Sequence, residues 1–187
     1  MTMVRDVGER ARRLAINRLG LWLFFLSESF LFSALLVTRF YLQGVSRPAE
    51  LNQSLGFAIS FVLILSSLTA YRAETAIAQG AETMFRRNIL YTILLGILFL
   101  AGVGLEWSEG FRLFPPSHGF GTIFFTLTGF HAFHVFTGIL ALAVLLMPRQ
   151  KGRFTPDNHW GVEAIVKYWH FVDVVWVFIF PALYLVS

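Results

Sequence analysis

The sequence contains no cysteine among its 187 residues. Disulfide bonds, iron–sulfur clusters and metal sites with thiolate ligands are therefore excluded. Charge is also scarce, because Asp, Glu, Lys and Arg make up 14% of the chain, compared with about 25% in soluble domains. The basic residues that exist lie in short segments between apolar runs, so the net charge of +4 does not indicate nucleic-acid binding.

The chain is mainly apolar. Hydrophobic residues make up 56% of the chain and its mean hydropathy is +0.65, which fits a chain whose solvent is mostly lipid. Five continuously apolar segments approach the roughly 20 residues that cross a bilayer. They are residues 19–40, 55–71, 88–107, 118–147 and 161–186. Because these runs do not alternate with polar residues, we predict an all-α fold, a single domain over residues 1–187 with five transmembrane helices.

The basic residues are distributed unevenly about these five segments. One side carries Arg5, Arg10, Arg12, Arg13, Arg18, Arg72, Arg86, Arg87, Arg149, Lys151 and Arg153, and the other carries Arg39, Arg47 and Arg112. Since positive residues remain inside, we predict a cytoplasmic N-terminus and a C-terminus on the periplasmic or outer side. The first apolar segment is longer than that of a signal peptide and no Ala-x-Ala-like site precedes it, so we expect no removable leader.

Glu28 lies midway along the first predicted helix, with no basic residue within one helical turn. A charge at the bilayer centre costs at least about 2.5–3.5 kcal/mol on insertion scales, so such residues are functional candidates. One interpretation is a protonated carboxyl that hydrogen-bonds to Ser27 or to a neighbouring helix. The other is a functional carboxyl that is proton-linked or faces lipid. The sequence leaves both open.

Two further groups of ionisable residues mark the last two predicted helices. They are His131 and His134 on the fourth, and Glu163, Lys167, His170 and Asp173 on the fifth. The spacing places each group on one helix face, and lipid penalises either face alone. We therefore predict that the two faces meet and that imidazoles pair with carboxylates in a structural network. The alternative is a metal site, because facing histidines can hold a haem and three histidines can bind copper or zinc.

Two motifs in the last two predicted helices are specific enough to compare with known families. Residues 161–176 contain the string Tyr-Trp-His-Phe-Val-Asp-Val-Val-Trp, and residues 128–135 read Thr-Gly-Phe-His-Ala-Phe-His-Val. They are similar to the last helix and to the preceding helix of subunit III of the haem-copper oxidases, which include cytochrome c and quinol oxidases. Ser27-Glu28 matches the family's membrane-embedded Ser-Glu, whose carboxylate is carbodiimide-reactive in the family, and Glu106-Trp107 resembles the Glu-Tyr or Glu-Trp that ends another family helix. The motifs follow the family order from Leu19 to Tyr184.

The resemblance implies a five-helix bacterial form. Longer members have seven helices, of which the first two form one arm of a lipid-binding cleft. The segment that ends at His159 corresponds to a family segment that contacts lipid headgroups. Thr155 and His159 match it directly, whereas Arg153 replaces a histidine and Asn158 also departs. Headgroup contacts are thus implied for Arg149, Arg153, Thr155 and His159, although positive-inside topology alone would also explain the basic residues.

The resemblance further implies a non-redox accessory subunit of a proton-pumping terminal oxidase in the bacterial inner membrane. This chain would bind no cofactor except structural phospholipids, and haems and copper would belong to its partners. Those partners would be the catalytic subunit I, subunit II and a small subunit IV as a further candidate. A haem-binding membrane anchor and an accessory subunit of nitric oxide reductase remain alternatives. Whether cytochrome c or quinol donates the electrons is open.

Overall fold

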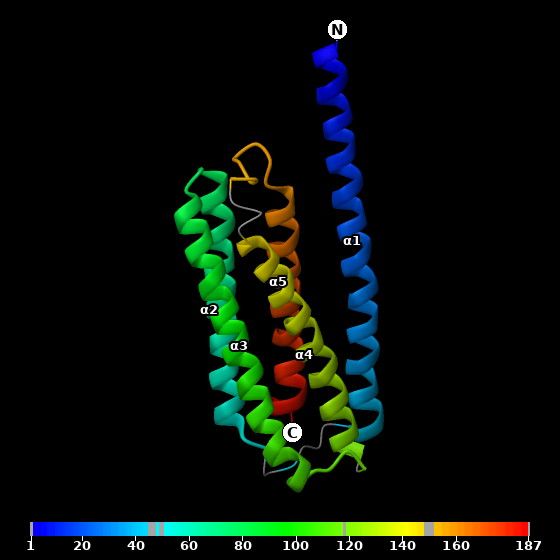
Figure 1. Ribbon diagram of the computed structural model, residues 1–187. Coiled ribbons are helices and arrows are strands. Elements are labelled where there is room, and N and C mark those ends of the chain that lie inside the picture. Colours follow the sequence, from blue (N-terminus) through cyan, green and yellow to red (C-terminus); the bar gives the residue numbers. More distant parts are fainter. Residues whose placement is uncertain (1, 45–47, 49–50, 118, 148–151, 187) are drawn as a thin grey trace.

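The computed structural model describes residues 2–44, 48, 51–117, 119–147 and 152–186 (Figure 1). These residues form five α-helices and a short π-helix, and they contain no β-strand. The elements are α1 (Thr2–Gln43), α2 (Gln53–Ala78), α3 (Glu82–Leu113), α4 (Gly119–Leu146), α5 (Trp160–Phe180) and η2 (Pro181–Leu185). All five α-helices are long and apolar enough to cross a membrane. The predicted fold class is therefore confirmed.

The helix bounds differ most from the predicted segments in α1. Hydropathy marks residues 19–40, but the helix already begins at Thr2. Arg, which occurs five times before position 19, is a good helix former, so the helix continues where hydropathy ends. At about 1.5 Å per residue its 42 residues extend about 63 Å, roughly twice the ~30 Å hydrocarbon thickness. Figure 1 shows the N-terminal part of α1 standing beyond the other helices.

The two ends of the bundle are different in composition. The α2–α3 turn, the α4–α5 loop and the N-terminal part of α1 lie at one end (Figure 1), and we call this the basic end because most of the arginines are there. Gly80 makes the α2–α3 turn possible with a φ of 75°, a backbone conformation that other residues avoid. The C-terminus lies at the opposite end.

Two tryptophans of α5 fill the centre of the bundle. Trp169 and Trp176 are fully buried, and their indole N–H groups donate to Ser66 at 2.9 Å and to Ser60 at 2.8 Å, both on α2. A Cβ added to Gly138 of α4 would lie 2.9 Å from the Trp169 ring. Small residues thus let α2 and α4 approach the indoles closely, as is typical of helix packing in membranes.

Helix α1 lies at the edge of the bundle and packs along α4 and α5. Of its most apolar 18-residue window, 11% is buried, compared with 56% for α5. Its less exposed residues recur at alternating intervals of four and three, which is the pattern of a single packing stripe. The stripe consists of Leu21, Phe25, Glu28, Phe32, Leu35 and Arg39, and the remaining less exposed residues, Leu14 and Leu36, lie one heptad before it and beside Leu35. Glu28 therefore belongs to the face of α1 that is turned toward the bundle.

Candidate functional site

Glu28 of α1 pairs with His134 of α4 near the middle of both helices. The His134 Nε2 lies 3.2 Å from the Glu28 Oε2, and the two side chains are 11% and 21% exposed. The His134 Nδ1 lies 2.7 Å from the Phe130 carbonyl oxygen. A carbonyl only accepts, so Nδ1 must carry a proton, and a single further proton is shared between Nε2 and Oε2. The pair thus joins α1 to α4 within the membrane-spanning part of both helices.

His131 points in a different direction from His134. It is fully buried, and within the described residues neither ring nitrogen has a hydrogen-bond partner. Its ring lies 4.9 Å from that of Trp176, 5.7 Å from Phe99 and 6.4 Å from Phe32, measured between centroids. His131 thus belongs to an aromatic cluster between α1, α3 and α5.

The prediction that the α4 histidines pair with α5 carboxylates is wrong for both. The carboxylate that meets His134 comes from α1, and His131 meets aromatic rings instead. The physical reason is geometric, because residues three apart on a helix point about 60° away from each other. His134 is therefore turned toward Glu28 of α1, and His131 toward Trp176 of α5 and Phe99 of α3.

Glu163 of α5 binds two cations at the basic end. Both of its carboxylate oxygens lie 3.3 Å from Arg18 Nη2 of α1, and Oε1 also accepts from Lys167 one turn further along α5. Arg18 and Lys167 lie 5.7 and 6.0 Å from the ring centre of Trp160, within the range of cation–π attraction. This cluster fastens α1 to the start of α5.

His170 and Asp173 are directed toward α2. The His170 Nδ1 lies 2.7 Å from the Ser67 hydroxyl. Asp173 is buried beside the same serine, yet neither of its carboxyl oxygens makes a hydrogen bond of normal geometry with the described residues. The predicted network residues are therefore divided among separate clusters. Glu28 belongs with His134, Glu163 lies with Arg18 and Lys167, and His170 and Asp173 lie beside Ser67.

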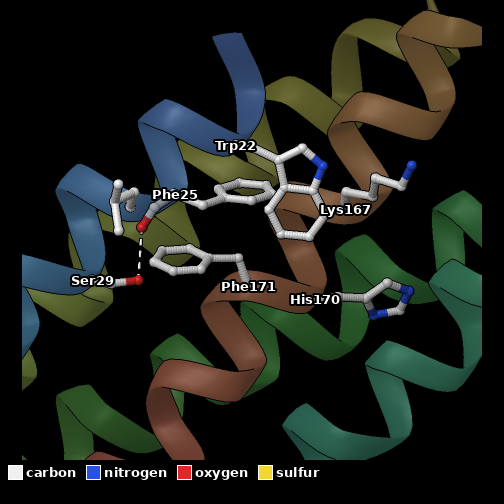
Figure 2. Close-up of a pocket in the computed structure, with 7 residues that line it drawn as sticks. Trp22, Phe25, Ser29, Lys167, His170 and Phe171 are labelled. Atoms are coloured by element: carbon white, nitrogen blue, oxygen red, sulfur yellow. Dashed lines mark hydrogen bonds between the residues drawn. The ribbon is translucent and has the colours of Figure 1, made fainter. Parts of the chain in front are cut away.

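A groove of about 580 Å³ runs between α1 and α5 beside these clusters (Figure 2). Its lining includes Trp22, Phe25 and Ser29 of α1 and Lys167 and Phe171 of α5. The rings of Phe25 and Phe171 stack at 4.9 Å and form its floor. A smaller hollow of about 190 Å³ shares Ser29 and Phe171 with the groove. The α1–α5 groove is thus mainly apolar, with one cation at its basic end.

The α4–α5 loop is folded against the bundle at the basic end. The His159 Nδ1 lies 3.1 Å from the Thr155 carbonyl oxygen, and Arg10 of α1 donates to the Asp157 carbonyl at 2.5 Å. The Gly152 amide donates to Glu82 of α3 at 3.2 Å. Thr155 and His159 therefore belong to one ordered turn near the start of α5. Arg153 precedes this turn, and Arg149 lies outside the described residues.

Glu106 is a buried carboxyl, and its hydrogen-bond partner could not be identified from the sequence. It is 3% exposed, and the Tyr184 hydroxyl of η2 donates to its Oε2 at 2.5 Å. Gln53 at the start of α2 donates to the Tyr184 carbonyl at 2.6 Å. These contacts join the C-terminal segment to α2 and α3. The available signal was an acidic residue inside an apolar run, but nothing in the sequence pointed to Tyr184.

Together, the fold and the clusters define a multi-pass helical membrane protein in which buried ionisable groups connect neighbouring helices. Within the described residues, no three His, Asp or Glu side chains lie close enough to hold a metal ion. His131, His134 and His170 face different neighbours, namely an aromatic cluster, α1 and α2.

Comparison with known proteins identifies the family. The sequence model described as cytochrome c oxidase subunit III matches residues 12–187. Cytochrome c oxidase subunit 3 of Corynebacterium diphtheriae is 34% identical over 200 residues, which cover 98% of this chain and 97% of the relative. The Synechocystis protein of the same name is 35% identical over 91% of this chain and 76% of its own length. A probable cytochrome c oxidase subunit 3 of Nocardia farcinica is 36% identical over 74% of this chain and 70% of its own.

The chain belongs to the cytochrome c oxidase subunit III family, as its motifs indicated. It is therefore a multi-pass membrane subunit of an oxidase complex that contains other subunits.

Proposed function

We propose that this chain is a non-redox accessory subunit of a proton-pumping haem-copper terminal oxidase, which reduces O₂ to water. It stabilises the catalytic subunit I, binds lipid and supports proton uptake at the cytoplasmic side of the bacterial inner membrane. Haems and copper belong to its partners, subunits I and II, and a small subunit IV completes the assembly. The basic end of the bundle faces the cytoplasm, in keeping with the excess of arginine there.

The pairing of His134 supports a structural task for the ionisable groups. Both of its ring nitrogens are engaged, one by the Phe130 carbonyl and one by Glu28. To bind a metal through either nitrogen, His134 would have to give up one of these contacts. The Glu28 carboxyl holds α1 against α4 and faces the bundle instead of lipid.

The α1–α5 groove is the observation that carries the lipid-binding part of the proposal. Its apolar floor of Phe25 and Phe171 suits an acyl chain, and Lys167 at the basic end suits a headgroup phosphate. A basic surface at the cytoplasmic interface attracts anionic lipid. Headgroup contacts by Arg149, Arg153, Thr155 and His159 would extend this site along the α4–α5 loop. A lipid in the groove supports α1 where protein packing is sparse.

Filling the groove tests this lipid site. Ser29→Phe places a ring in the space between α1 and α5, so the purified oxidase complex should retain one tightly bound phospholipid fewer and lose activity sooner during turnover. Leu23→Phe is the matched control, because Leu23 is on α1, is 56% exposed and does not line the groove. Lipid is counted by mass spectrometry of the extracted complex. Equal lipid content and equal lifetime in both variants would refute lipid binding in this groove.

Co-purification tests the assembly. A tagged chain should bring subunits I and II out of the membrane, with the haem spectrum following subunit I when the subunits are separated by detergent. A Soret band that stays with the isolated chain would instead favour a haem-binding anchor. Recovery of a nitric oxide reductase would identify the other enzyme.

A further inference from the structure

A second hollow lies on the opposite flank of the bundle, at the basic end of the α2–α3 hairpin. It has a volume of about 310 Å³. Its polar lining includes Arg72 and Thr75 of α2, Gln79 directly after that helix, and Arg87 and Asn88 of α3. Arg72, Thr75 and Gln79 are three or four residues apart and the α3 residues are adjacent, so the hollow lies between one face of α2 and one face of α3. Figure 1 shows this hairpin on the side away from α1, so the hollow is separate from the α1–α5 groove.

The two arginines of this hollow differ from several others at the same end. Arg18 pairs with Glu163, Arg10 donates to the Asp157 carbonyl, and Arg86 donates to the Leu146 carbonyl that ends α4. Within the described residues, Arg72 and Arg87 have neither a hydrogen bond nor an ion pair. Two guanidinium groups thus line one hollow without an acceptor from the described part of the chain.

Carboxylates near the hairpin are directed elsewhere. Among the residues that the structure describes, no Asp or Glu lines the hollow. Glu82, in the first turn of α3, accepts from the Gly152 amide of the α4–α5 loop at 3.2 Å. Glu74 of α2 interacts electrostatically with Lys167 and Glu163 of α5, on the other side of its helix. The hollow therefore carries positive charge that is complementary to an anion.

The depth and surroundings of the hollow indicate which anion it suits. Arg72 lies six residues before the end of α2 and Arg87 five residues after the start of α3, or about 8 Å from the hairpin tip. Toward the membrane centre, the same two helix faces continue with exposed apolar or aromatic residues. These are Ile64 and Leu68 on α2, and Tyr91, Leu94 and Leu98 on α3. A cationic hollow above a continuous apolar strip matches an amphiphile with a phosphate headgroup.

We propose that the Arg72–Arg87 hollow binds the headgroup of one anionic phospholipid, whose acyl chains lie along the exposed faces of α2 and α3. The two guanidinium groups donate to the phosphate oxygens, a geometry in which arginine forms strong paired hydrogen bonds. Thr75 and Gln79 provide further donors at the rim. This site goes beyond the α1–α5 groove, and neither depends on the other.

Replacing both arginines in the intact oxidase complex tests the site. Delipidated complexes are titrated with phosphatidylglycerol, and bound lipid is counted per complex by mass spectrometry. Arg72→Gln with Arg87→Gln should raise the half-saturating concentration of one phosphatidylglycerol about thirtyfold, the effect expected for two interfacial cations. Arg72→Lys with Arg87→Lys keeps the charge and should retain most of the binding. Arg12→Gln with Arg13→Gln on the exposed N-terminal part of α1 is the charge-matched control.

Each outcome of this titration is decisive. Equal phosphatidylglycerol binding in the glutamine pair and the control pair would overturn the proposal, with thermal unfolding used to establish that both complexes are folded. Release of a neighbouring subunit with unchanged lipid content would show that a partner carboxylate occupies the arginines instead. Displacement of the lipid by millimolar inorganic phosphate, without recovery on adding more phosphatidylglycerol, would indicate a free-phosphate site. A fall in phosphatidylglycerol binding in the Ser29→Phe complex but not in the glutamine pair would support the α1–α5 groove and overturn the Arg72–Arg87 site.

Discussion

The Glu28–His134 pair should make a measurable contribution to the attachment of α1. Glu28→Leu removes the partner of His134 Nε2, a nitrogen 3.2 Å from the carboxyl and largely shielded from water. Leaving a buried polar atom unsatisfied costs about 1–3 kcal/mol. The two side chains are only 11% and 21% exposed, and surrounding lipid tails offer no hydrogen-bond partner. We therefore expect the free energy of unfolding to fall by about 2 kcal/mol.

A double-mutant cycle separates the pair from its surroundings. Glu28→Leu, His134→Leu and the double variant are compared by thermal unfolding and by the detergent concentration that releases the subunit from the oxidase. If the side chains interact, the double variant loses less than the sum of the two single losses, by about 1–2 kcal/mol. Additive losses would refute the pairing.

Glu28→Gln separates the role of Glu28 in holding α1 against α4 from a role of its ionisable proton. Since the His134 Nδ1 donates to the Phe130 carbonyl, a neutral ring presents Nε2 as an acceptor, to which the glutamine amide can donate. We therefore expect assembly to be retained and the stability loss to remain below about 1 kcal/mol. If turnover lifetime in the reconstituted complex nevertheless falls, the proton of Glu28 has a role of its own. An unchanged lifetime would leave Glu28 as a structural residue only.

Two further predictions concern the core. Tyr184→Phe removes the hydroxyl that donates to the buried Glu106, so the free energy of unfolding, measured by thermal unfolding of the complex, should fall by about 1–3 kcal/mol. Adding Glu106→Leu should reverse part of that loss. An unchanged stability in Tyr184→Phe would contradict the contact. Gly138→Val places branched atoms against the Trp169 ring, which lies only 2.9 Å from where a Cβ would stand. This variant should lower the free energy of unfolding by about 1–3 kcal/mol. Gly104→Val is the control, because a Cβ there meets open space, and it should be better tolerated in the same assay.

The sequence was sufficient to predict the five helices because lipid imposes a simple requirement. A spanning segment must be helical and apolar over about 20 residues, so hydropathy alone locates it. The bounds of α1 could not be predicted in this way. The residues before position 19 are polar yet form helix well, so the membrane-crossing part and the helix are different lengths.

The candidate residues could be predicted, but their partners could not. The cost of burying charge identifies Glu28, His134 and Glu163 in any apolar run. The partner of His134, however, is 106 positions away on a helix whose placement no local pattern specifies. One signal was available, because Glu28 occupies the stripe of Phe25 and Phe32 at intervals of three and four. That pattern indicates an inward-facing carboxyl and argues against one that faces lipid.

The placement of the polar contacts explains how α1 stays attached with so little packing. In a bilayer, apolar contact between helices gains little over contact with lipid, so hydrogen bonds and close packing must hold them together. Arg18 binds Glu163 at the basic end, Glu28 binds His134 in the middle, and Arg39 lies 5.4 Å from the ring centre of Phe120 near the opposite end. Successive contacts are about ten residues apart, or about 15 Å along the helix.

Between these three contacts, the flank of α1 that faces α5 borders the α1–α5 groove, so lipid and polar contacts share the task of holding the helix. Removing one polar contact should therefore be tolerated better while lipid fills the groove. We expect Glu28→Leu to lower the stability of α1 attachment more in a delipidated complex than in one supplied with phospholipid. The same loss in both preparations would show that the polar contacts act alone, because a lipid that supports α1 must compensate for part of what the carboxyl provides.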